Sequence, residues 1–176
     1  ELNTVDNVYV CPAMGDDGLS LGAAYLSNFR HNPNDKRQVL NNVYLGQTWN
    51  ENDIIDAIKE KDLEFKKSGE IEEEVGKLLA ESKVVARCNG RMEFGPRALG
   101  NRSILAAPFD KTINDWLNEQ LKRTEFMPFA PSIIEEQAAE YFIGWKKEHF
   151  TSQFMTITYD VIEEKQAGIA AVVHVD

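Results

Sequence analysis

Apolar residues recur at helical spacing along much of the chain. From residue 70 to 82 they fall three and four positions apart, which places them on one face of a helix, while a run of glutamates falls mostly outside that face. The same reasoning predicts four further helices. They cover residues 19–29, a stretch that contains Ile54 and Ile58, a stretch that contains Ile113 and Leu121, and residues 135–142.

Two helix starts carry capping signals. Thr48 and Glu51 stand in the Ser/Thr-x-x-Glu arrangement, in which the hydroxyl and the carboxylate satisfy backbone donors at the first turn. We therefore predict that Thr48 begins the helix that contains Ile54. Asp110 is predicted to cap the helix that contains Ile113.

Short apolar runs without helical spacing predict β-strands. They lie near residues 8–10, 84–86, 103–107, 132–134, 153–161 and 168–175. Because strands and helices alternate irregularly, we expect an α/β fold of the mixed α+β type, in which a twisted mixed sheet is covered by helices.

Residues 31–47 are rich in Asn, Pro and Asp and lack a periodic apolar pattern, so they are interpreted as a linker. We place a domain boundary between residues 45 and 46. The 176 residues fit one main domain. The chain starts at Glu1 and stops just after a predicted strand, so we expect it to be a piece of a longer protein.

Composition excludes several classes. No apolar run reaches the roughly 18 residues of a membrane span, and no signal peptide is recognisable, so we expect a cytoplasmic protein without membrane contact. Cys11 and Cys88 are far apart, which argues against a disulfide framework or a zinc site. The net charge of −10 argues against nucleic-acid binding.

One segment departs from this acidic background. Residues 87–102 carry four arginines against Glu93 alone, which suits a small anionic ligand. Within it, glycines allow sharp turns, and Arg91, Arg97 and Arg102 can converge on phosphate. Glu93 either orients an arginine or helps to hold Mg²⁺. Neutral hydrogen bonds and a second cationic pair come from Asn101, Ser103, Lys122 and Arg123.

An alternative is a solvated Gly-Pro-Arg turn whose arginines pair with surface carboxylates. The segment is neither a Walker loop nor a Gly-x-Gly-x-x-Gly loop, so the mechanisms of those motifs do not transfer to it.

Residues 90–105, Gly-Arg-Met-Glu-Phe-Gly-Pro-Arg-Ala-Leu-Gly-Asn-Arg-Ser-Ile-Leu, closely resemble the signature of the O-carbamoyltransferases of nodulation-factor and antibiotic biosynthesis. Further pieces agree in order along essentially the whole chain. They are Asn118 to Lys122, residues 126–132, Glu136 with Tyr141 and Phe142, and His174 to Asp176.

The resemblance implies two domains. Residues 1–45 would be the end of an actin-like ATPase-superfamily domain that transfers the carbamoyl group, and residues 46–176 a YrdC-like domain that packs on it. The second domain would convert ATP and carbamoyl phosphate into carbamoyladenylate, for transfer to a hydroxyl acceptor. Sugars, nodulation factors and antibiotic precursors are equally open as acceptors.

The resemblance also implies residue roles. Arg91, Arg97 and Arg102 are expected to be catalytic and, with Asn101, Ser103, Lys122 and Arg123, to bind carbamoyl phosphate and the ATP phosphates with Mg²⁺. Asp16 resembles a ligand for Fe²⁺ or another divalent metal in the full-length enzyme, with Asp17 as a competitor and an ordinary turn as the alternative.

Met127 stands where some relatives carry an arginine, and Lys122 and Arg123 are the substitutes that we expect. Four aromatic residues are candidates for stacking adenine or for the core: Phe126, Phe129, Tyr141 and Phe142. Two further functions stay open, namely a phosphate-binding or regulatory module without catalysis, and an interaction domain whose arginines dock an acidic partner.

Overall fold

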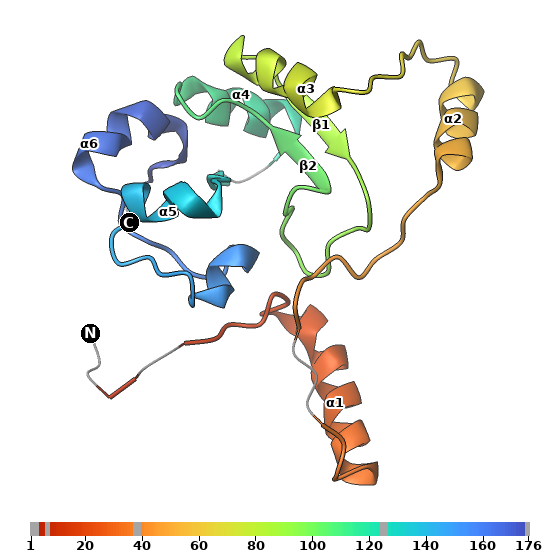
Figure 1. The fold of residues 1–176 in the computed structure, drawn as a ribbon, viewed down its shortest axis with the longest axis vertical. Helices are drawn as coiled ribbons and strands as arrows, with labels where there is room; N and C mark the ends of the chain where they lie inside the picture. The colour runs from red at the N-terminus through yellow and green to blue at the C-terminus, as the bar shows by residue number, and fades with distance from the viewer. Residues whose placement is uncertain (1–3, 6–7, 37–39, 124–126, 175–176) are drawn as a thin grey trace.

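The computed structural model describes residues 4–5, 8–36, 40–123 and 127–174 (Figure 1). In these residues, helices precede and follow a single pair of strands. In chain order the elements are η1 (Asp16–Gly18), α1 (Leu19–His31), α2 (Glu51–Glu60), α3 (Ile71–Ala80), β1 (Val85–Cys88), β2 (Arg102–Leu105), α4 (Thr112–Gln120), α5 (Glu135–Tyr141), η2 (Phe150–Phe154), α6 (Glu163–Gln166) and η3 (Ala167–Val172).

The sheet consists of β1 and β2, which run antiparallel. Val85 lies opposite Leu105, and Cys88 lies opposite Arg102. The mixed class of the fold is confirmed, and so are the helices predicted at α1 to α5. The YrdC-like architecture stays a prediction. The pairing makes residues 89–101 the connection between the two strands.

The other predicted strands are wrong. Residues 8–10 and 132–134 have no strand assignment, residues 150–154 form η2, and residues 167–172 form η3. Among the described residues outside the sheet, one isolated bridge joins Phe142 to Val161. A continuous apolar run fits a buried helix as well as a strand, and its period cannot separate the two.

The start of α2 also differs from the prediction. Asn50, not Thr48, is the N-cap: its side chain accepts a hydrogen bond from the backbone N–H of Asp53 (3.0 Å), and the Asp53 carboxylate accepts one from the Asn50 N–H (3.1 Å). Asn50 and Asp53 form the same reciprocal pair, with an amide oxygen in place of the hydroxyl and aspartate in place of glutamate. At the start of α4 the N-cap is Lys111 rather than the predicted Asp110, although the Asp110 carboxylate accepts a hydrogen bond from the N–H of Thr112 (2.9 Å).

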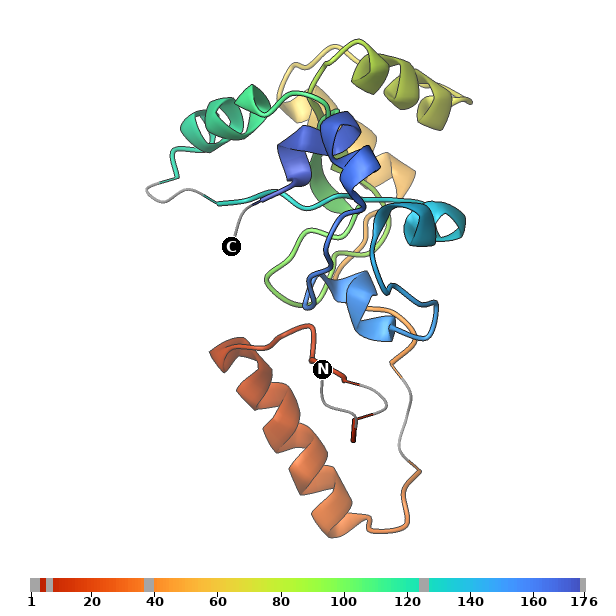
Figure 2. The same ribbon diagram turned by 90° about the vertical axis from the view of Figure 1, so that its left-hand side faces the viewer.

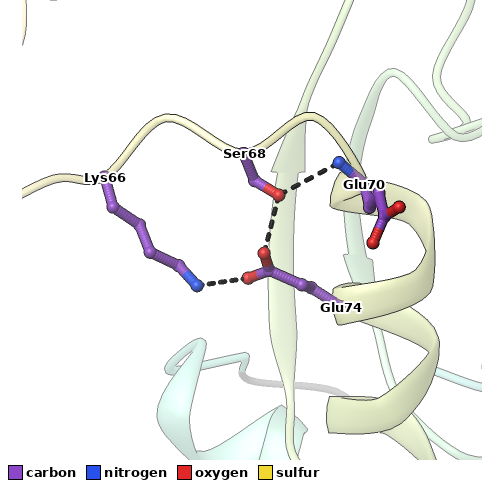
Figure 3. A network of polar contacts seen from close by, with 4 residues as sticks. All are labelled: Lys66, Ser68, Glu70 and Glu74. Carbon is purple, nitrogen blue, oxygen red and sulfur yellow. Dashed lines mark hydrogen bonds and ion pairs between the residues drawn. The ribbon is translucent and has the colours of Figure 1, made fainter.

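A polar network fixes the start of α3 (Figure 3). The Ser68 hydroxyl accepts a hydrogen bond from the N–H of Glu70 (3.1 Å) and donates one to Glu74 (2.6 Å), while Lys66 pairs with the other oxygen of Glu74 (2.6 Å). The hydrogen bonds from Lys66 and Ser68 lower the pKa of Glu74. The network is accessible to solvent, so it orders the turn more than it adds stability.

The core is small and involves segments far apart in the sequence. Its buried apolar residues are Ala13, Val43, Leu117, Ala138, Phe154 and Ala171. Neither α1 nor α2 contains a buried residue, and α1 projects from the rest of the chain in both ribbon views (Figures 1 and 2). Within the described ranges, no helix combines the length and the apolar character needed to cross a bilayer.

Two buried asparagines on α4 connect the core to the later part of the chain. Asn114 donates a hydrogen bond to the carbonyl oxygen of Ala171 (2.7 Å), and Asn118 donates to those of Asn114 (2.8 Å) and Met127 (3.3 Å). Side chains thus satisfy backbone acceptors where a sheet was expected.

Candidate functional site

The connection between β1 and β2, residues 89–101, closes around one carboxylate. Glu93 is buried, with 8% of its surface exposed. Its Oε1 atom accepts hydrogen bonds from the backbone N–H groups of Leu99 (2.9 Å), Asn101 (2.7 Å) and Arg102 (3.1 Å). Gly100, with a φ of 104°, lies between these donors and lets the chain turn them toward one point. Residues 89–102 are called the arginine loop below.

The charge of Glu93 follows from these contacts. Burial raises the pKa of its carboxyl group, but backbone N–H groups, its own and those of Arg102, Leu99 and Asn101, outweigh burial and hold the pKa below the usual value. Glu93 is therefore ionised at neutral pH. It orients the backbone of the loop, a third role beside the two that the sequence suggested.

Two of the three predicted arginines are tied to backbone carbonyl groups. Arg91 donates from Nε to the oxygen of Gly46 (3.0 Å) and from Nη2 to that of Leu45 (2.8 Å). Arg102 donates from Nη1 to Asn89 (3.0 Å) and Asn101 (2.9 Å), and from Nη2 to Gly90 (3.1 Å). Each guanidinium has N–H groups beyond those used here, so both keep donors for an anion.

Arg97 differs from these two. It is half-buried, and it makes no hydrogen bond or ion pair with any residue that the structure describes. Arg102 is half-buried as well, whereas Arg91 is exposed. The loop thus holds one uncommitted guanidinium between two that are already oriented.

Asn101 and Ser103 support the loop from within. The side-chain amide of Asn101 donates to the carbonyl oxygen of Arg91 (2.7 Å), and the Ser103 hydroxyl accepts a hydrogen bond from the N–H of Gly100 (2.8 Å). Both residues fix the backbone next to the arginines. Their predicted contact with a ligand stays a prediction.

Residues 43–47 run along the loop as a strap, which the sequence had suggested to be part of a linker. Gly46 donates to the oxygen of Met92 (2.9 Å), Met92 donates to that of Gln47 (3.1 Å), and the Tyr44 hydroxyl donates to that of Leu99 (2.9 Å). A Cβ at Gly46 would lie 2.8 Å from the Cβ of Met92. In the sequence, the only signal for the close approach of these two backbones was that position 46 is a glycine.

The N-terminal segment also contacts the loop. Gly95 has a φ of 105°, and a Cβ there would lie 3.1 Å from the carbonyl oxygen of Pro12. Thr151, which is buried in η2, accepts a hydrogen bond from the N–H of Val10 (3.3 Å) and donates one to the oxygen of Val8 (3.3 Å). Segments on both sides of the predicted boundary at residues 45 and 46 therefore hold the loop.

The second predicted cationic pair lies elsewhere. Lys122 and Arg123 follow α4, and the guanidinium of Arg123 lies 5.3 Å from the ring centroid of Phe129. Among the described residues, no hydrogen bond or ion pair joins this pair to the arginine loop. Their role as phosphate ligands stays a prediction.

Asp16 and Asp17 are exposed in η1. Within the described ranges, no group of three His, Cys, Asp or Glu side chains is placed to hold a metal ion. A metal at Asp16 would need ligands from outside these residues, as the resemblance implies. Mg²⁺ at Glu93 also stays a prediction, since the contacts of Oε1 are to backbone N–H groups.

The aromatic candidates already have ring contacts of their own. Tyr141 carries the amino group of Lys165 at 4.9 Å from its centroid, and Phe142 lies 6.2 Å from Tyr159. Phe126 lies outside the described residues, as do Val175 and Asp176. Sequence reasoning missed Trp49, whose ring lies 5.0 Å from the guanidinium carbon of Arg102.

Comparisons with known proteins agree with the signature in the arginine loop. The family model described as the carbamoyltransferase C-terminus matches residues 76–176. An uncharacterized protein of Methanocaldococcus jannaschii is 41% identical over 97% of this chain and 33% of its own length. The nodulation protein NolNO of Sinorhizobium fredii is 35% identical over 97% of this chain and 25% of its own length.

An enzyme with a named reaction is also similar. The 3'-hydroxymethylcephem-O-carbamoyltransferase of Streptomyces clavuligerus is 33% identical over 100% of this chain and 31% of its own length. The chain spans between a quarter and a third of the length of these three relatives. Since the family model matches more than half of the chain, the chain belongs to the O-carbamoyltransferase family.

Proposed function

We propose that this chain binds ATP and carbamoyl phosphate and forms carbamoyladenylate, from which the carbamoyl group passes to a hydroxyl of a small-molecule acceptor. Formation of the adenylate consumes one water molecule and releases phosphate and pyrophosphate. The carbamoyl oxygen becomes bonded to the α-phosphorus as the bond to pyrophosphate breaks. The family supports carbamoyl transfer, and the arginine loop supports the binding of phosphates.

The observation that carries the proposal is the state of Arg97. Arg97 is half-buried and has no hydrogen-bond or ion-pair partner among the residues that the structure describes, which is unusual because charged groups away from water are normally paired. An anionic ligand would supply that partner. Because the Glu93 carboxylate holds the backbone at Arg102, the loop is organised before the ligand arrives, which lowers the entropic cost of binding.

Arg91 and Arg102 would complete the site. Their bonds to carbonyl groups fix the guanidinium planes while leaving N–H groups for phosphate oxygens. Three cations near one loop would stabilise the charge that develops on leaving pyrophosphate. Mg²⁺ bound to the nucleotide would neutralise further phosphate charge, and a divalent metal would be held by the transfer domain of the full-length enzyme.

Two other functions were open. Docking of an acidic partner asks for arginines open to solvent, whereas Arg97 and Arg102 are half-buried. A phosphate-binding module without catalysis would use the same contacts as the enzyme. Release of pyrophosphate separates the two.

Calorimetric titration with ATP·Mg²⁺ and with carbamoyl phosphate tests the proposal. We expect saturable binding by the wild-type chain and an affinity about 10- to 150-fold weaker for Arg97→Ala, because charge-assisted hydrogen bonds contribute about 1.5–3 kcal/mol. Arg30→Ala is the matched control, since Arg30 is exposed in the last turn of α1.

Circular dichroism verifies that each variant is folded. Absence of binding by the folded wild-type chain, or equal affinities for wild type and Arg97→Ala, would contradict the proposal. Binding of both ligands without release of pyrophosphate would favour the module without catalysis.

A further inference from the structure

Trp49 is not part of the arginine loop, but its ring contacts Arg102, the last residue of the loop. It follows the strap by two residues and directly precedes Asn50, the N-cap of α2. The Arg102 guanidinium covers one face of its ring at 5.0 Å from the centroid. Since that guanidinium is itself bound to three carbonyl groups, the indole is held from one side by a fixed cation.

Trp49 remains exposed to solvent despite this contact. Trp49 has 45% of its surface exposed, whereas tryptophan is on average largely buried. Trp116 is similarly exposed, at 47%, but it lies on α4. Trp145 donates a hydrogen bond to the Ser152 hydroxyl (3.4 Å) and is half-buried. Among the contacts of the described residues, the arginine loop places a guanidinium on the ring of Trp49 and on neither of these two tryptophans.

We propose that the exposed part of Trp49 is the stacking surface for the purine of the nucleotide whose phosphates bind the arginine loop, an inference that rests on the function proposed for this loop. Nucleic-acid bases stack on aromatic side chains whatever their sequence, because every base has a π-face. The guanidinium on one face keeps the indole plane fixed. A fixed plane costs little entropy when a base binds to it.

The position of Trp49 suits one mononucleotide. The guanidinium carbon of Arg102, a proposed phosphate ligand, lies 5.0 Å from the centroid of the Trp49 ring. A phosphate donor and the ring therefore lie within the length of one nucleoside triphosphate. The net charge of −10 makes a polynucleotide unsuitable as the ligand.

Trp49 suits this role better than the aromatic residues near α5. Tyr141 has Lys165 on its ring, and Phe142 packs against Tyr159. Phe129 contacts Arg123, for which no contact with the arginine loop is seen among the described residues. Trp49 combines an exposed ring with a direct contact to a proposed phosphate ligand.

The test compares Trp49→Ala with Trp116→Ala, a control of nearly equal exposure. By calorimetry, we expect the dissociation constant for ATP·Mg²⁺ to rise about 5- to 150-fold in Trp49→Ala and to stay unchanged in Trp116→Ala. The dissociation constant for carbamoyl phosphate, which has no base, should stay unchanged in both. Trp49→Phe should retain most of the affinity for ATP, and ATP should quench tryptophan fluorescence in wild type but not in Trp49→Phe.

The possible outcomes distinguish a failure of the stacking proposal from a failure of the proposed function. If the wild-type chain binds both ligands and Trp49→Ala binds ATP within about twofold of wild type, stacking on Trp49 is wrong and the function of the loop stands. If Trp49→Ala weakens carbamoyl phosphate as much as ATP, Trp49 acts by positioning Arg102, which also overturns stacking. If the folded wild-type chain binds neither ligand, the proposed function itself fails.

Discussion

The Oε1 atom of Glu93 accepts three backbone hydrogen bonds, and this arrangement depends on the ionised carboxylate. We expect Glu93→Gln to lower the free energy of unfolding at pH 7 by about 1–3 kcal/mol, since hydrogen bonds to a charged acceptor are replaced by weaker ones. Glu64→Gln, at an exposed position, should change it little. Urea unfolding monitored by circular dichroism measures both values.

The pH dependence of that difference has a definite sign. Because the pKa of Glu93 is lowered in the folded chain, its stabilisation is present above the unfolded pKa of about 4.3 and is lost as the pH falls through the folded pKa. The gap between wild type and Glu93→Gln should therefore narrow below about pH 4. A gap that is constant from pH 3 to 7 would show that the charge of Glu93 does not matter.

The sequence predicted the residue types of this site better than their contacts. Arginines and glycines at short spacing correctly indicated a cationic loop with sharp turns. The acceptors of Arg91 were not predictable, because carbonyl groups have no sequence signature and Gly46 lies 45 positions away. Trp49 was missed for the same reason, since its contact with Arg102 joins distant positions.

At the scale of elements, the start of α2 offers a direct comparison between the sequence prediction and the structure. We expect Asn50→Ala to destabilise α2 by about 1 kcal/mol, because it removes the acceptor for the Asp53 N–H group. Thr48→Ala should have almost no effect. Amide hydrogen exchange within residues 51–60 measures the local free energy. A larger destabilisation of α2 by Thr48→Ala than by Asn50→Ala would support the capping box predicted from the sequence.

Helices were predicted well and strands poorly, and the reason is physical. Helix α3 has apolar residues on one face over several turns, a pattern that a strand cannot use. Residues 168–173 are almost continuously apolar, which fits either state. Their conformation depends on distant partners: Ala171 donates to the carbonyl of Pro108 and accepts from the side chain of Asn114. A hydrogen bond donated by a distant side chain to the backbone is invisible in a local pattern.

At the scale of the whole chain, the N-terminal segment and the arginine loop meet at Gly95. We expect Gly95→Ala to cost more stability than Gly100→Ala. Both glycines have φ near 105°, so each substitution carries similar backbone strain of about 1–3 kcal/mol. A Cβ at Gly95 would also press on Pro12, whereas at Gly100 nothing lies within 4 Å. The difference in stability between the two variants therefore measures the contact between Gly95 and Pro12.

Thermal unfolding and hydrogen exchange of residues 8–13 measure that contact. Faster exchange of this segment in Gly95→Ala, with little change in Gly100→Ala, is the expected result. Equal exchange and equal stability in the two variants would mean that other contacts, such as the hydrogen bonds of Thr151 and Thr156, hold the segment.

Because the acceptors of Arg91 and Arg102 are backbone carbonyl groups, the chain tolerates amino-acid substitutions at some of the residues that carry them. Every amino acid carries a backbone carbonyl, so replacing the side chain of Leu45 or Asn89 leaves those acceptors in place. Replacing either arginine removes the bonds outright. The information that shapes the loop is therefore concentrated in a few donors, one carboxylate and the glycine at position 46, while a strap position such as Leu45 is free to vary.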